Sequence, residues 1–206
     1  EKLHYLNAAP INAIADRWIR QYSRERVRAL ADLKTALEAP MTETAADFVY
    51  TTFVYATPEQ VWRGLTDPNF TRRYWGVELR SDWKIGSPVA WIERGVTLED
   101  PEQVVLESDP YRRLAYVFPA FTRKYTDVSG FDDETAAKVV SEGSSHVAFD
   151  IEGLDDKVKL TVVHGGLAPG GAVQHLISGG WPVVLTNLKT FLEVDAVLPE
   201  NLSTAH

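Results

Sequence analysis

Apolar residues near the end of the chain recur with the spacing of an α-helix. Four of them follow one another at separations of four, three and four positions and therefore share one helical face: Trp181, Leu185, Leu188 and Leu192. Pro182 suits the first turn of such a helix, because the N–H group that proline lacks has no partner there. The pattern predicts one long C-terminal helix that begins at about Gly179 and buries an apolar stripe.

Short runs of alternating apolar and polar residues precede this helix and predict an antiparallel sheet. The expected strands span residues 48–56, 76–82, 88–94, 96–99, 103–108, 113–119, 145–152 and 157–164. Between the first two, Thr57, Pro58 and Gln60 have the pattern of a capping box that starts a helix. A second short helix is expected over 68–74, and residues 121–143 have the mixed, acidic composition of a loop.

The order of these elements predicts an α+β fold. A single amphipathic helix that follows an antiparallel sheet must bury its apolar stripe against that sheet. We therefore expect a curved antiparallel sheet wrapped around the long C-terminal helix, in a domain that spans residues 44–206.

Residues 1–43 are predicted to form a separate N-terminal helical extension. A short alternating segment at 2–7 is followed by a helical pattern from Pro10 to about Leu37. This pattern is longer than most globular helices, which favours pairing with a second helix. We expect a symmetric homodimer through four apolar residues of the helix: Ile11, Ile14, Trp18 and Tyr22. The alternative is a helix that folds back onto its own domain.

Composition narrows the functional classes. The chain has 206 residues, 45% of them hydrophobic, which is enough for a sizeable core. It has no cysteine, which excludes disulfides and thiolate metal sites. A net charge of -8 argues against nucleic-acid binding across the whole surface. We expect no membrane-spanning segment and a cytoplasmic location. Because the chain starts at Glu1 rather than methionine, we also expect further residues upstream in the natural protein.

The sequence offers poor catalytic signatures. It contains neither a Gly-x-Ser-x-Gly elbow nor a His-Glu-x-x-His motif. The five histidines are far apart along the chain: His4, His146, His164, His175 and His206. We therefore expect no catalytic residue, no metal site and no cofactor. A polar pair such as His164 with Tyr116 or Tyr50 keeps an enzymatic alternative open.

Several segments resemble the START-like helix-grip superfamily, also called SRPBCC, and within it the branch of activators of the heat-shock-chaperone ATPase. They agree in order and spacing over residues 46–195 and include Ala56-Thr57-Pro58-Glu59-Gln60-Val61-Trp62, Leu106-Glu107-Ser108-Asp109-Pro110, Leu160-Thr161-Val162-Val163-His164 and Gly180-Trp181-Pro182. The first forty residues are similar to the wing strand and dimerisation helix that end an ArsR-type winged-helix repressor.

The resemblance implies a sheet that grips the long helix and often leaves an apolar cavity beside it, where a hydrophobic small molecule binds. The residues that we expect to line the cavity are Trp75, Trp91, Tyr116, Phe118, His164, Trp181 and Leu185. The alternative for each aromatic residue is plain core packing. For His164 it is a hydrogen-bonded position within the core.

Three functions follow as hypotheses. The first is a non-enzymatic ligand-binding domain that serves as the sensor of an ArsR-type transcriptional regulator, in which only an upstream domain binds DNA. The second is a protein-interaction module that acts on a chaperone, as the branch implies. The third is a small cyclase- or dehydratase-type enzyme that uses the cavity.

Overall fold

The computed structural model describes residues 47–195, which form a five-stranded sheet, a three-stranded sheet and five helices. The elements follow in this order: β1 (Phe48–Val54), α2 (Pro58–Thr66), α3 (Pro68–Tyr74), β2 (Glu78–Arg80), β3 (Ala90–Glu93), β4 (Val96–Leu98), β5 (Val105–Asp109), β6 (Arg113–Phe118), α4 (Arg123–Val128), α5 (Asp133–Ser141), β7 (Ser145–Gly153), β8 (Val158–Gly165) and α6 (Ala172–Asp195). The predicted N-terminal strand and helix lie outside the described residues. So do the four residues expected to form a dimer contact: Ile11, Ile14, Trp18 and Tyr22.

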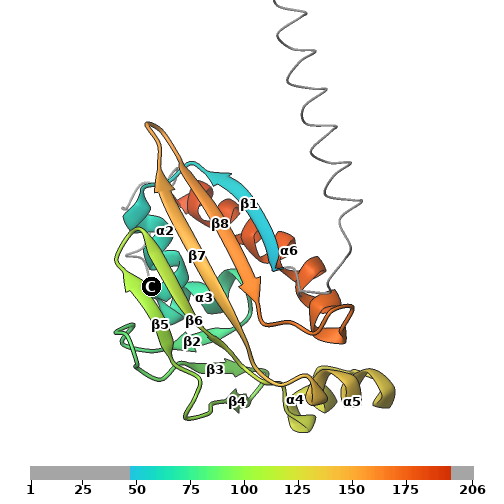
Figure 1. Cartoon of the computed structure of the whole chain (residues 1–206). Helices are drawn as coiled ribbons and strands as arrows, with labels where there is room; N and C mark the ends of the chain where they lie inside the picture. Colours follow the sequence, from blue (N-terminus) through green and yellow to red (C-terminus); the bar gives the residue numbers. More distant parts are fainter. Residues whose placement is uncertain (1–46, 196–206) are drawn as a thin grey trace, which may run out of the picture. The chain divides into compact units, whose positions relative to one another are not determined.

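Both sheets are antiparallel throughout. The larger one has the strand order β1-β8-β7-β6-β5, and the smaller one the order β2-β3-β4. Helices α2, α3 and α6 lie on one face of the larger sheet, while α4 and α5 lie at one end of it (Figure 1). This arrangement confirms the predicted α+β fold, with a curved antiparallel sheet against a long C-terminal helix.

Local signals place the two helices that follow β1. Thr57 Oγ1 accepts a hydrogen bond from the Gln60 N–H, and the Gln60 side chain accepts one from the Thr57 N–H, which completes the predicted capping box. Asp67 caps α3 by accepting from the Asn69 N–H. Both helices begin with proline, whose missing N–H has no partner in a first turn.

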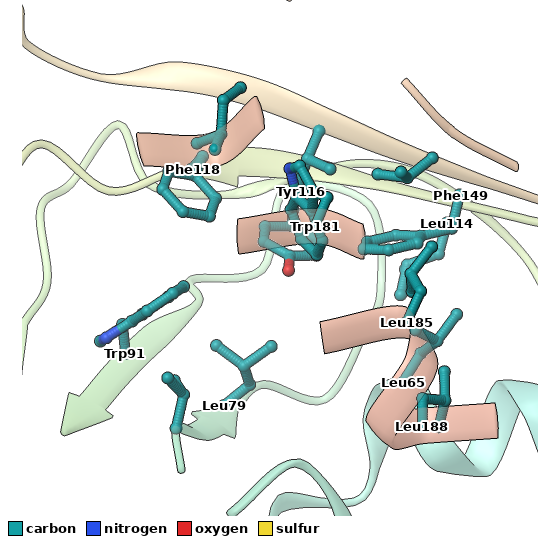
Figure 2. Close-up of a cluster of buried hydrophobic side chains, with 14 of the residues drawn as sticks. Leu65, Leu79, Trp91, Leu114, Tyr116, Phe118, Phe149, Trp181, Leu185 and Leu188 are labelled. Carbon is teal, nitrogen blue, oxygen red and sulfur yellow. The ribbon is translucent and has the colours of Figure 1, made fainter. Parts of the chain in front are cut away.

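The core lies between α6 and the larger sheet. The predicted α6 stripe is buried, with exposed fractions of 5% or less for four residues: Trp181, Leu185, Leu188 and Leu192. Figure 2 shows Trp181, Leu185 and Leu188 among buried side chains of β6, β7 and α2. At about 1.5–3 kcal/mol for each fully buried large apolar side chain, this stripe is a main source of stability.

Helix α6 begins earlier than predicted. It starts at Ala172, so Pro182 lies in its interior and not in its first turn. The side chain of Glu142, at the end of α5, accepts hydrogen bonds from the N–H groups of Ala172 and Val173, at 2.6 Å and 3.1 Å. A carboxylate at this position satisfies unpaired N–H groups and complements the helix dipole. Although α6 has 24 residues, no described helix is apolar enough to span a membrane.

The loop expected over residues 121–143 is wrong, because this segment folds into α4 and α5. Thr122 Oγ1 accepts from the Tyr125 N–H at the start of α4, and Asp132 accepts from the N–H groups of Glu134 and Thr135 at the start of α5. Asp132 is therefore a helix cap and not part of a loop. Tyr125 on α4, with Phe121 and Phe131 on either side of that helix, lines the site described next.

Candidate functional site

An aromatic pocket of about 210 Å³ lies between α6, the smaller sheet and α4. Its aromatic lining comes from separate elements: Trp75 after α3, Trp91 on β3, Phe118 on β6, Phe121 before α4, Tyr125 on α4, Phe131 before α5 and Trp181 on α6. Leu176 also lines the pocket and is 39% exposed, so the space reaches the surface beside α6.

The aromatic rings of the lining hold one another in place. Trp75 packs against Trp91 at 4.9 Å between ring centroids and against Trp181 at 5.2 Å. Phe118 lies 5.1 Å from Trp91, and Phe121 stacks on Tyr125 at 4.9 Å. Edge-to-face and offset arrangements of this kind stabilise aromatic clusters beyond their burial. The wall is thus formed before any ligand arrives.

Gly180 leaves room on the α6 side of the pocket. It lines the space, and a Cβ atom added to it would meet nothing within 4 Å. A glycine inside a helix costs about 1 kcal/mol relative to alanine. Gly179 and Gly180 are consecutive glycines within α6, and Pro182 follows them. These glycines weaken α6 at the position where the missing side chain of Gly180 leaves the pocket open.

Glu93 is the one charged residue among the described residues that line the pocket. Its Oε2 accepts a hydrogen bond from the Tyr125 hydroxyl at 2.8 Å and from Trp91 Nε1 at 3.2 Å. Its Oε1 lies 3.7 Å from Nε of Arg94, and the Glu93 side chain is only 17% exposed. Burial, together with the hydrogen bond to Glu93, raises the pKa of Tyr125 well above its ordinary value. Tyr125 therefore stays protonated and donates to the carboxylate.

His164 lies behind the pocket and is fully buried. Its Nδ1 accepts from Trp181 Nε1 at 2.9 Å, and its Nε2 is 2.7 Å from Ser145 Oγ. An indole N–H can only donate, so Nδ1 must carry no proton. The proton of the neutral ring is then on Nε2, which donates to the Ser145 hydroxyl.

Burial keeps His164 neutral. Burial, with a smaller repulsion from His146, lowers the pKa of His164 to about 3. A base that activates Ser145 would need a free lone pair on Nε2, which is the protonated nitrogen here. The contact of Ser145 and His164 is therefore structural. It links β7 to β8, and the hydrogen bond from Trp181 links His164 to α6.

The structure separates the predicted lining residues into two groups. Trp75, Trp91, Phe118 and Trp181 line the pocket. Tyr116, His164 and Leu185 are fully buried beside it and are absent from its lining, and His164 pairs with neither predicted tyrosine. Figure 2 shows Tyr116 and Leu185 within the packed cluster. The Tyr116 hydroxyl is buried without a hydrogen-bond partner.

Sequence reasoning missed three kinds of lining residue. Phe121, Tyr125 and Phe131 fell in the segment expected to be a loop. The signals that could have placed them are two helix caps, Thr122 directly after Phe121 and Asp132 directly after Phe131. Glu93 alternates with Trp91 on one strand, which places both on one face. Gly180 was assigned to a helix start. Within residues 47–195, no three His, Asp or Glu side chains are grouped so that they could hold a metal ion.

Comparisons with known proteins agree with this fold. Residues 55–193, more than half of the chain, match the family described as Activator of Hsp90 ATPase homolog 1-like protein. A comparison with curated proteins gives no match.

Solved structures of similar fold include the solution structure of the Aha1 dimer from Colwellia psychrerythraea, 15% identical, covering 72% of this chain and 97% of that chain, with a TM-score of 0.54. Protein MLL2253 from Mesorhizobium loti is 20% identical, covering 71% and 96%, with a TM-score of 0.53. ChR145 from Cytophaga hutchinsonii is 23% identical, covering 76% and 100%, with a TM-score of 0.53. At these identities the likeness shows the helix-grip fold alone.

Proposed function

Because this chain belongs to the Activator of Hsp90 ATPase homolog 1-like family, we propose that its helix-grip domain binds a small, mostly apolar molecule in the aromatic pocket without transforming it. One observation carries the proposal: a wall of mutually packed aromatic rings surrounds a space that Gly180 leaves open. Ligand sites in proteins combine such apolar walls with a few polar groups that fix orientation.

The size of the pocket limits its ligand. Its volume of about 210 Å³ lies below the roughly 300–1,000 Å³ typical of sites for drug-sized ligands. An engineered apolar cavity of about 150 Å³ in another protein binds benzene. A molecule with one ring and a small substituent therefore fits the space.

The chemistry around the pocket favours binding over turnover. His164, the best candidate for a catalytic base, has its one lone pair on Nδ1 engaged by the Trp181 N–H, carries its proton on Nε2 beside Ser145, and does not line the pocket. The Tyr125 hydroxyl is engaged with Glu93 and is a weak acid in its buried place. Neither group is available to take a proton from a bound molecule.

Two glycine variants test the binding site. Gly180→Leu places a side chain in the pocket, whereas Gly179→Leu adds the same side chain to the same helix at a position outside the lining, again with nothing within 4 Å of the new Cβ. We expect tert-butylbenzene to quench or shift tryptophan fluorescence in the wild type and in Gly179→Leu. Gly180→Leu should bind at least about tenfold more weakly, because the probe would lose its space. Equal binding by both variants would place the site elsewhere.

We further propose that the ligand-binding domain is the sensor of a dimeric regulator and that residues 1–43 form the dimer contact. The candidate contact residues Ile11, Ile14 and Trp18, with Tyr22, lie outside the described residues. Support comes from the Colwellia structure, which is a dimer of the same fold. A ligand regulates such a dimer only if it binds one arrangement more tightly than another.

Native mass spectrometry tests the dimer. We expect a homodimer for the wild-type chain and a monomer for Ile14→Asp, because a buried charge disrupts an apolar helix contact. Thr42→Asp, outside the predicted helix, is the matched control. A wild-type monomer at micromolar concentration would remove the sensor role and leave the binding proposal intact.

A further inference from the structure

Glu93 gives the aromatic pocket a negative charge on one wall. We propose that the pocket selects a small organic cation, such as an alkylated or aryl-substituted ammonium group. The inference rests on the proposed function, since it names the chemical class of the ligand bound at the same site.

The hydrogen bonds of Glu93 orient its carboxylate without cancelling its charge. Both donors to Oε2, the Tyr125 hydroxyl and the Trp91 indole, are neutral groups. They fix the carboxylate plane at the pocket wall and leave Oε1 without a hydrogen bond from the described residues. A carboxylate oxygen has two lone-pair sites, so Oε1 can accept from a ligand.

Arg94 forms a long ion pair with this oxygen and no hydrogen bond. Its Nε is 3.7 Å from Oε1, beyond hydrogen-bond distance, and its side chain is 61% exposed. Arg94 sits in a tight turn with a φ of 50°, followed by Gly95 with a φ of 76°. Water screens a pair of this kind, which makes exposed ion pairs weak. The charge of Glu93 therefore remains effective on the pocket side.

The rings beside Glu93 provide a second attraction for a cation. Three indoles, those of Trp75, Trp91 and Trp181, line the same space. The face of an indole attracts cations more strongly than any other aromatic side chain, and the attraction grows when water is excluded. A quaternary ammonium group is large and weakly hydrated, so it gains from aromatic faces and from a nearby carboxylate together.

A neutral ligand fits less well for an electrostatic reason. Any molecule that fills the pocket displaces water from around Glu93. Loss of water from a charge costs free energy unless a partner replaces it. A cation offsets that cost, whereas a neutral molecule of the same shape does not, so the pocket should distinguish the two.

The competing explanation is that Glu93 only holds α4 against β3 through Tyr125. Glu93→Gln separates the two roles, because the amide oxygen can still accept from the Tyr125 hydroxyl but carries no charge. Glu99→Gln removes one negative charge at an exposed position outside the lining and is the control for net charge. Gly180→Leu remains the control for the site itself.

The experiment compares phenyltrimethylammonium with tert-butylbenzene, which have the same shape and differ by one positive charge. Dissociation constants are measured by tryptophan fluorescence for wild type, Glu93→Gln and Glu99→Gln. We expect the cation to bind wild type and Glu99→Gln about tenfold or more tightly than the neutral probe. In Glu93→Gln that preference should fall several-fold, to the part that the indole faces alone provide.

Three outcomes would overturn the cation preference, and one of them would also reject the proposed function. Equal or tighter binding of tert-butylbenzene to wild type would overturn the cation preference while supporting the apolar binding site. A preference that is undiminished in Glu93→Gln would also overturn it. Failure of both probes to bind wild type would reject the proposed function together with this inference.

Discussion

Two polar clusters adjoin the same group of aromatic rings, and they differ in what they leave unpaired. In the first, Ser145, His164 and Trp181 form a hydrogen-bonded chain within the core. In the second, Glu93 accepts from Tyr125 and Trp91 at the pocket wall. In the first cluster, both ring nitrogens of His164 are hydrogen-bonded to other buried residues. In the second, Oε1 of the pocket-lining Glu93 accepts no hydrogen bond from the described residues and has only Arg94 nearby, at 3.7 Å.

The difference teaches where function can reside in this fold. A buried polar group whose hydrogen bonds are all satisfied contributes order, and it has nothing left to offer a ligand. A charged group that is oriented but incompletely paired can still recognise one. Trp181 belongs to both regions, because its N–H holds His164 while its ring lines the pocket.

Removing Trp181 should have the largest effect on stability. Trp181→Ala deletes a side chain that is 2% exposed, and large-to-small changes of this kind cost about 3–5 kcal/mol. Trp181→Phe keeps a ring but leaves Nδ1 of His164 without a donor, for which we expect a loss of about 1–3 kcal/mol. Urea unfolding measures both. The control is Val183→Ala, which alters an exposed residue of the same helix. Similar losses for Val183→Ala and Trp181→Ala would contradict the account.

Acid should weaken the closed cluster through His164. The pKa of His164 falls from 6.5 to about 3 on folding. The unfolded chain therefore takes up a proton as the pH falls below 6.5, while the folded protein does not. The stability contributed by the neutral ring is complete above that pH and decreases below it.

The size of this pH effect can be measured against a variant. Between about pH 7.5 and 5.0, above the range in which most carboxylates titrate, we expect a loss of about 2 kcal/mol from His164. His164→Gln, which cannot titrate, should lack this part of the pH dependence, and the remaining histidines cancel in the comparison. Parallel pH profiles for the two proteins would show that His164 titrates normally in the folded state.

The Tyr116 hydroxyl gives the smallest expected change in stability, and its removal should stabilise the protein. It is buried without a partner, and an unpaired buried hydroxyl costs folding free energy. Tyr116→Phe removes only that oxygen and should raise the free energy of unfolding by about 1 kcal/mol. Thermal and urea unfolding measure the change. A loss of stability would mean that the hydroxyl has a partner in solution and belongs with the satisfied groups.

Local signals in the sequence predicted the frame of the fold. Thr57 and Gln60 lie within one helical turn, so their capping box can be read directly from the residues. The same holds for the hairpin of β7 and β8 and for the four-residue stripe of α6. In each case the residues that interact are close in sequence or repeat with one period.

The parts that sequence reasoning missed depend on contacts between distant residues. Glu142 fixes the start of α6 from 30 positions away, through hydrogen bonds to Ala172 and Val173. Without that partner, Pro182 looked like the natural first turn. Four of the seven predicted lining residues do line the pocket. Tyr116, His164 and Leu185 lie one layer deeper, a difference of depth that neither the alternation of a strand nor the period of a helix shows.

The most direct test of the central claim uses the tryptophans as site-specific reporters. We propose to follow the indole N–H signals of ¹⁵N-labelled protein by NMR during titration with tert-butylbenzene. Trp75, Trp91 and Trp181 line the pocket, whereas Trp62 and Trp83 lie outside that lining. The account predicts that the first three signals shift together and saturate while the other two stay in place. Equal shifts of Trp62 and Trp83, or no shift of the three pocket signals, would contradict it.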